Sequence, residues 1–183
     1  MPKSIQKWLE AGYELFAIEG PDGVQVEKLA RRLGLNKSGF YHNFGDHESF
    51  FSALVQYHSQ VNEQFCNEIR QLEKFDPDFL KLAIKYRTAV SAQMQFRKHS
   101  GNPMFKKAFE DAQNHNKRFI IPLWADYLQI PDDMSLATEL YGIFRDVFFI
   151  HIGFEDLTYE LSHNLAMGFS LIIKALKRQV NRD

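Results

Sequence analysis

The chain has little of what stabilises or anchors proteins outside a reducing compartment. It has one cysteine, Cys66, in 183 residues, so an intramolecular disulfide is excluded. No apolar run approaches 18 residues, and no basic segment followed by an apolar stretch opens the chain. The sequence therefore predicts neither a membrane span nor a signal peptide, and the cytoplasm is the simplest expected location.

An excess of positive charge is also lacking. The chain has 22 basic and 23 acidic residues, and its formal net charge is -1. This balance excludes a protein that binds polyanions with its whole surface, so any contact with nucleic acid must come from a local patch. A glycine-rich phosphate loop, a zinc-like Cys/His set and a serine elbow are missing as well. We therefore expect no catalytic residue, no metal and no cofactor.

Phenylalanine and helical spacing are what the sequence has in abundance. There are 17 Phe against 2 Trp, which predicts a core rich in flat, wide side chains. Apolar residues recur with the spacing of a helix and strict alternation is scarce, which predicts an all-α fold of about nine helices. We expect one helix from Pro77 to Met94. Two helices are expected over 104–112 and 116–128, with a kink or break at Pro122 within the second.

Three short helices fit into the first 46 residues, and longer helices follow. Small residues at Ala30 and Gly34 allow two helices to approach through a tight turn, and Gly34 suits a positive φ. We expect a helix-turn-helix domain over residues 1–46 and a helical bundle over 47–183. The spacing of Ala30 and Gly34 alone fits a plain helical hairpin equally well.

The polar face of this hairpin favours a contact with nucleic acid. Between Gln25 and His47 four cations stand against two acids, a formal charge of +2 in a chain of net charge -1. A short helix with small and polar residues at its N-terminal end can enter the major groove, while neighbouring groups hold the phosphates. The basic doublet Arg31-Arg32 is more simply explained as a solvated face.

Three segments here resemble a known family. They are 9-LEAGYELFAIEG-20, 29-LARRLGL-35 and 37-KSGFYHNFGDHESFF-51. Together they make residues Trp8 to Tyr57 similar to the N-terminal domain of the TetR family of bacterial transcriptional regulators. The resemblance implies phosphate contacts from Lys37 and Tyr41 and core positions for Phe40 and Phe44. It also implies that the residues nearest the bases are Asn36, Ser38, Gly39 and His42. The whole set of expected DNA-binding residues is Gln25, Asn36, Lys37, Ser38, Gly39, Tyr41, His42 and His47.

The sequence departs from the family pattern at two places. Val24-Gln25 stands where the family often has Thr or Ser at the start of the second helix, and His47 stands where many members have Lys. Gly39 lowers helix propensity by about 1 kcal/mol, and we interpret it as allowing close approach to DNA. Simple tolerance of a glycine explains it nearly as well.

For the larger bundle the resemblance implies an effector-binding and dimerising domain. The last two helices are apolar on more than one face, which indicates both the bundle and a second subunit as partners. The expected dimer residues are Leu140, Val147, His151, Leu165, Phe169 and Ile172. A small, largely apolar effector would lie among Tyr86, Met94, Phe96, Phe105, Phe109, His115, Trp124, Tyr127, Phe144 and Phe148. We expect a homodimer that binds double-stranded operator DNA and is released by the effector, with repression as the family default.

Two other classes of protein stay open. Glu160 and His163 form one Glu-x-x-His, the spacing of a di-iron site in a helical bundle, but a second copy is missing. A metal-binding, enzyme-like protein is therefore disfavoured. A helical interaction protein that no longer reads DNA is the other alternative, and Gln25 and His47 keep it open.

Overall fold

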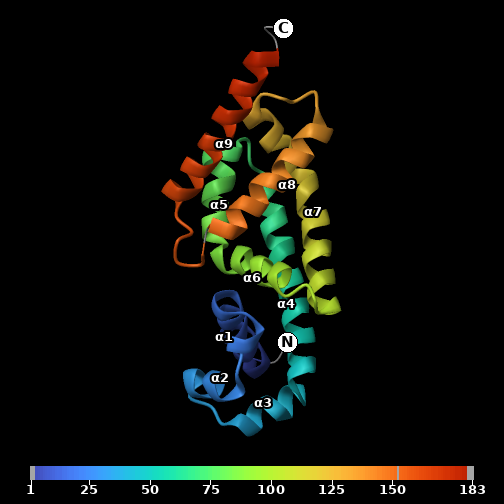
Figure 1. Ribbon diagram of the computed structural model, residues 1–183. Coiled ribbons are helices and arrows are strands. Elements are labelled where there is room, and N and C mark those ends of the chain that lie inside the picture. The colour runs from blue at the N-terminus through green and yellow to red at the C-terminus, as the bar shows by residue number, and fades with distance from the viewer. Residues whose placement is uncertain (1–2, 152, 181–183) are drawn as a thin grey trace. The chain divides into compact units, whose positions relative to one another are not determined.

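The computed structural model describes residues 3–151 and 153–180, and within them the chain is all-α, as predicted (Figure 1). It contains nine α-helices, a 3-10 turn at Pro21–Gly23 and an irregular helical segment at Phe75–Phe79, and no strand is present in these ranges. The helices are α1 (Lys3–Glu19), α2 (Val26–Leu33), α3 (Lys37–Phe44), α4 (His47–Ile69), α5 (Leu80–Lys85), α6 (Arg87–Lys98), α7 (Pro103–Leu128), α8 (Met134–His151) and α9 (Tyr159–Val180).

Two of the expected helix boundaries are wrong. The helix expected from Pro77 to Met94 is broken at Tyr86, whose ψ of 28° ends α5. No glycine or proline marks this break. The Tyr86 hydroxyl donates to Glu68 Oε1 at 2.6 Å, and Lys85 pairs with the same carboxylate, so contacts with α4 accompany the break.

The second error is the pair of helices expected over 104–112 and 116–128, because α7 is one helix of 26 residues that also contains Pro122. A proline inside a helix costs about 3 kcal/mol. Pro122 itself is exposed, whereas Ile121, Trp124 and Ala125 around it are buried. Packing of these neighbours therefore holds the helix together across the proline.

The chain divides into two compact units. The first comprises residues 1–64 and 88–112, and the second comprises residues 65–87 and 113–183. Helices α4 and α7 each contribute one stretch to either unit. The division of function at residue 46 remains a prediction, since compactness alone does not assign function to a segment.

The first unit has an aromatic core that explains part of the phenylalanine excess. The rings of Phe16, Phe96 and Phe105 lie with centroids 4.7 to 5.6 Å apart, and all three side chains are buried. Gly12 is needed here for close approach, because a Cβ at this position would lie 2.3 Å from Phe50 Cζ. The core thus fixes α1 against α4, and with it the start of the helix-turn-helix.

A buried chain of hydrogen bonds crosses the same unit. The Tyr13 hydroxyl lies 2.6 Å from His58 Nδ1, and His58 Nε2 lies 3.0 Å from Gln93 Oε1. Gln93 Nε2 in turn donates to the Phe109 carbonyl at 2.9 Å. Burial lowers the pKa of His58 to about 4, so the ring is neutral near pH 7 and can donate through Nε2 while accepting at Nδ1. Helices α1, α4, α6 and α7 are joined by this network.

The second unit has an aromatic core of its own. Trp124 is fully buried, with Phe144 at 4.7 Å, Phe75 at 4.8 Å and Phe169 at 5.6 Å between ring centroids. Tyr127 stacks on Trp124 at 5.8 Å. The Trp124 indole Nε1 is buried and has no hydrogen-bond acceptor in the described structure. A buried donor without an acceptor is unfavourable by about 1 to 3 kcal/mol.

Candidate nucleic-acid interface

Local hydrogen bonds shape the turn between α2 and α3. Gly34 ends α2 with a φ of 65°, in the left-handed region, as its position in the sequence predicts. The N–H of Leu35 donates to the Ala30 carbonyl at 2.9 Å, which closes the helix end. Chain direction therefore changes within three residues, and α3 starts directly afterwards.

The N-terminus of α3 is capped by Asn36. Its Oδ1 accepts from the Gly39 N–H at 2.9 Å and from the Ser38 hydroxyl at 2.7 Å. Two residues expected near the bases, Asn36 and Ser38, are thus used for a structural cap in the free protein. Asp46 caps α4 in the same way, with the Ser49 N–H at 2.7 Å, and this hydrogen bond lowers the pKa of Asp46.

One buried aromatic side chain holds α3 in place. Phe40 is fully buried, with ring centroids of Phe50 at 5.1 Å and Trp8 at 5.6 Å. Phe44 lies beside it at 5.2 Å and is partly exposed. The two family core positions therefore lie on the packed side of α3, and the opposite side is free.

The free side of α3 presents polar groups. Tyr41 is 49% exposed, and Lys37, Ser38 and His42 are exposed as well. Gly39 has room for a side chain within the chain itself, since a Cβ there would come no closer than 3.5 Å to Asn36 Oδ1. The protein core therefore does not require glycine at this position.

The start of α2 lacks the side-chain cap of a Thr or Ser. Gln25 is the N-cap residue, but its side chain makes no capping bond, and Nε2 lies 3.4 Å from the Asp22 carbonyl. His47 is exposed, and its ring packs against Phe40 at 5.6 Å. Both residues lie at the polar surface of the first unit, where they were expected.

Ion pairs within the first unit were missed by the sequence patterns. Lys37 Nζ lies 2.7 Å from Glu27 Oε1, and this contact lowers the pKa of Glu27 and raises the pKa of Lys37. Arg32 pairs with Glu14 and Lys28 pairs with Glu19. Spacings of 9 to 18 residues carry no helical periodicity, so only the fold reveals these partners.

The expected effector residues are split between the two units. Phe96 and Phe105 are buried in the first unit's aromatic core, and Met94 and Phe109 belong to that unit too. Six residues lie in the second unit: Tyr86, His115, Trp124, Tyr127, Phe144 and Phe148. Of these, Trp124, Tyr127, Phe144 and Phe148 share one connected ring cluster.

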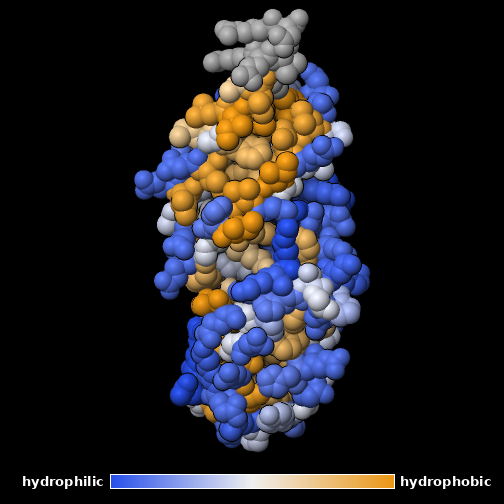
Figure 2. All heavy atoms as spheres, viewed as in Figure 1, coloured by the Kyte–Doolittle hydropathy of each residue, from blue (hydrophilic) through white to orange (hydrophobic). Residues whose placement is uncertain are grey.

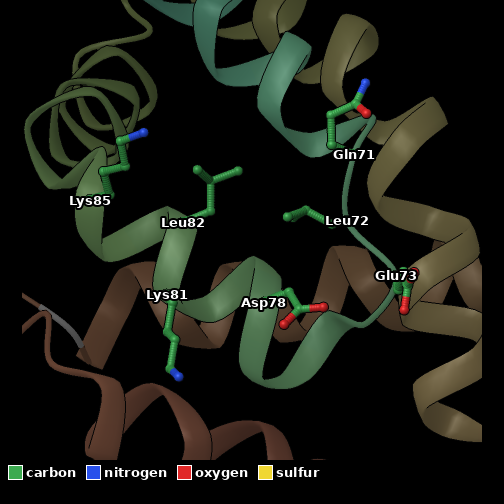
Figure 3. Close-up of a pocket in the computed structure, with 7 residues that line it drawn as sticks. All are labelled: Gln71, Leu72, Glu73, Asp78, Lys81, Leu82 and Lys85. Carbon is green, nitrogen blue, oxygen red and sulfur yellow. The ribbon is translucent and has the colours of Figure 1, made fainter.

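A surface hollow of about 430 Å³ lies elsewhere in the second unit (Figure 3). Leu72 and Leu82 face one another across it, and charged side chains surround them. None of the expected effector residues lines it; the lining residues are Gln71, Leu72, Glu73, Asp78, Lys81, Leu82 and Lys85.

Four of the six expected dimer residues lie on two apolar seams. In α8 the seam runs through Leu136, Leu140, Ile143, Val147 and Ile150, with alternating steps of four and three residues. Ile143 is 54% exposed and Ile150 is 77% exposed. In α9, Leu161, Leu165, Ile172 and Leu176 have similar spacing, and Ile172 is 60% exposed. Figure 2 shows apolar side chains gathered over α8 and α9.

The remaining expected positions differ from these seams. Phe169 packs onto Trp124 and is partly buried, and His151 is exposed at the end of α8. His163 of the Glu-x-x-His pair contacts Asp76, with Nδ1 2.6 Å from Oδ2, and Glu160 is exposed. Among the described residues, no group of three or more His, Cys, Asp or Glu side chains could hold a metal ion. None of the helices in the same ranges is long and apolar enough to cross a membrane.

Comparison with known proteins agrees with this geometry. Residues 9–54 match the model of a family described as bacterial regulatory proteins, tetR family. These residues run from α1 through the helix-turn-helix into α4. The match lies in the N-terminal segment whose sequence motifs predict a resemblance to the TetR family, and it supports that resemblance.

Solved structures share the fold along nearly the whole chain. A TetR/AcrR-family transcriptional regulator from Aquifex aeolicus VF5 has a TM-score of 0.63 and 19% identity, covering 92% of this chain and 99% of its own. A candidate transcriptional regulator from Saccharomonospora viridis, solved in complex with choline, has a TM-score of 0.65 and 17% identity, covering 94% and 96%. A candidate TetR-family regulator from Mesorhizobium loti MAFF303099 has a TM-score of 0.57 and 16% identity, covering 96% and 98%. No curated protein matches the chain.

Proposed function

We propose that the protein is a ligand-responsive repressor that binds operator DNA as a homodimer through α2 and α3. The observation that carries this proposal is the two-sided character of α3. Phe40 is fully buried on one side, while Lys37, Ser38 and Tyr41 are exposed on the other. A helix held in this way offers donors to phosphates and bases without unfolding any part of the core.

The proposed roles differ along this surface. Lys37 and Tyr41 contact phosphate. The residues that approach base edges are Asn36, Ser38, Gly39 and His42, and Gln25 and His47 flank them. The ion pair of Lys37 with Glu27 and the cap made by Asn36 and Ser38 must rearrange or be shared when DNA binds.

Binding to duplex DNA at several salt concentrations tests this function. Wild-type protein is expected to bind, with log K falling linearly as log salt rises. The double variant Lys37→Ala with Tyr41→Phe is expected to bind at least tenfold more weakly and with a shallower salt dependence. A matched control is Lys106→Ala with Tyr57→Phe, which changes the same residue types at positions outside the proposed interface. A folded Lys37/Tyr41 variant that binds like wild type would exclude this assignment.

We further propose that the second unit binds the effector near Trp124. Its indole N–H has no acceptor among the described residues, and the rings of Tyr127, Phe75 and Phe144 pack against the Trp124 ring. Aromatic faces attract quaternary ammonium groups, and the Saccharomonospora viridis relative was solved with choline. Choline is therefore the first compound to test beside largely apolar molecules.

An uncharged analogue separates the two kinds of effector. Choline and 3,3-dimethylbutanol have similar shapes, and only choline carries a charge. Calorimetric titration is expected to give stronger binding of choline if ring faces recognise the cation, and equal binding if the site is simply apolar. Trp124→Phe removes the N–H donor and is expected to weaken the binding of either ligand. Release of DNA by the bound compound then tests the coupling, because an effector must bind the DNA-free and DNA-competent states differently.

A further inference from the structure

The cations of the DNA-facing surface are matched by acids of the same unit. The formal charge of +2 over residues 25–47 leaves out Glu14 and Glu19, which lie earlier, on α1. These two carboxylates pair with Arg32 and Lys28. Lys37 pairs with Glu27, and Arg31 is the cation of this segment for which the described structure gives no ion pair. The surface is thus less positive than its own segment suggests.

The ion pair between Lys37 and Glu27 differs from the other two ion pairs in its position. It joins the first turn of α2 to the first turn of α3, the two helix starts that would face phosphate. The Lys37 side chain is 56% exposed and the Glu27 side chain is 66% exposed. A solvent-exposed pair contributes little to stability, so the carboxylate can be exchanged for another anion.

We propose that Glu27 competes with DNA phosphate for Lys37 and so restrains the affinity of this protein for any duplex. The inference rests on the proposed DNA-binding function. When a phosphate reaches Lys37, Glu27 must give up its partner, and its negative charge then stays close to the phosphate. Both effects weaken binding that depends only on the charge of the DNA phosphates.

This restraint acts on the part of the affinity that all duplexes share. Phosphate contacts carry no sequence information, whereas contacts from Ser38, Gly39 and His42 to base edges do. Lowering the shared phosphate contribution leaves a larger part of the total affinity to the base contacts. Glu27 therefore acts as a positioning residue that lowers affinity for specific and non-specific duplexes by a similar factor, and the difference between the two affinities stays with the base contacts.

Glu27→Gln is the direct test, with fluorescence anisotropy on a random-sequence 30-bp duplex at several salt concentrations. The substitution keeps the size of the side chain and removes its charge. We expect affinity to rise about fivefold at low salt, and the slope of log K against log salt to steepen by about 0.9 for each additional phosphate contact. Glu27→Asp keeps the charge and is expected to remain close to wild type. Thermal unfolding checks that each variant is folded.

Two controls separate the proposed contact from a general change of charge. Glu14→Gln removes the same charge from the same unit but releases Arg32, and we expect a clearly smaller gain. In a Lys37→Ala background, Glu27→Gln is expected to have little effect, because the group for which it competes is gone. An equal gain in that background, or from Glu14→Gln, would mean that overall charge and not Lys37 is responsible.

The two hypotheses fail in different ways. Wild-type protein that binds no duplex and no genomic fragment at any salt concentration overturns the proposed function, and the inference with it. Wild-type protein that binds, while Glu27→Gln shows unchanged or weaker binding, overturns the inference alone.

Discussion

Helices α3 and α9 expose surfaces of opposite chemical character to solvent. Helix α3 buries Phe40 completely and exposes Lys37, Ser38 and His42. Helix α9 leaves apolar side chains uncovered, with Leu171 at 58%, Ile172 at 60% and Leu176 at 54% exposure. A polar surface is stable in water by itself, whereas a continuous apolar seam is not. The comparison indicates that α3 is suited to a charged partner and α9 to an apolar one.

Removal of the Phe40 side chain, which packs α3 against the core, is expected to have the largest effect on stability. Phe40→Ala removes a fully buried ring that contacts Trp8 and Phe50, and should lower the free energy of unfolding by about 3 to 5 kcal/mol. Denaturant titration measures this change. Tyr41→Phe, next to it but exposed, is the control and should leave stability within about 0.5 kcal/mol. Equal stability of the two variants would contradict the two-sided description of α3.

Acid is expected to weaken the core that carries α3. The folded pKa of His58 is about 4 and its ordinary value is 6.5, so between these values the unfolded chain binds more protons than the folded one. Stability should therefore fall as pH decreases from about 6.5 to about 4, by about 3 kcal/mol from this residue. The His58→Gln variant can keep hydrogen bonds to Tyr13 and Gln93 and cannot titrate at this position. Its loss of stability over the same pH range should therefore be smaller. Parallel pH profiles for both proteins would argue against a buried, neutral His58.

A charge introduced into the apolar seam of α9 is expected to weaken dimer formation. Ile172→Glu would place a carboxylate in the proposed dimer interface and should weaken dimerisation by about 100-fold. Sedimentation velocity over a range of concentrations measures the shift. Asn114→Glu, exposed on α7, adds the same charge away from the seam and should leave the dimer unchanged. If both variants dimerise like wild type, another surface must form the interface.

The smallest effect is expected at Gly39. A Cβ there has room in the free protein, so Gly39→Ala should stabilise α3 by about 1 kcal/mol through helix propensity. The same methyl group should weaken DNA binding if the backbone approaches DNA closely at this point. Unchanged DNA affinity together with higher stability would identify Gly39 as a tolerated residue.

Much of the fold could be predicted because its causes are local. Gly34 has the positive φ that its position requires, and Asn36 and Asp46 cap the helices that follow them. The predicted count of nine helices agrees with the structure only because two errors cancel. One helix was expected where Tyr86 separates α5 from α6, and two were expected where α7 continues through Pro122. Both errors arise from packing against residues far away in the sequence.

The sequence by itself determined the helical class, the two-sided pattern of α3 and the family of the first 50 or so residues, because helix periodicity, capping and glycine turns depend on neighbours within a few positions. Only the tertiary structure decided which of the cations are already paired with an acid. Lys28, Arg32 and Lys37 look free in the sequence, yet Glu19, Glu14 and Glu27 lie against them in space. Electrostatic interaction depends on distance in three dimensions, and that distance exists only once the helices have packed.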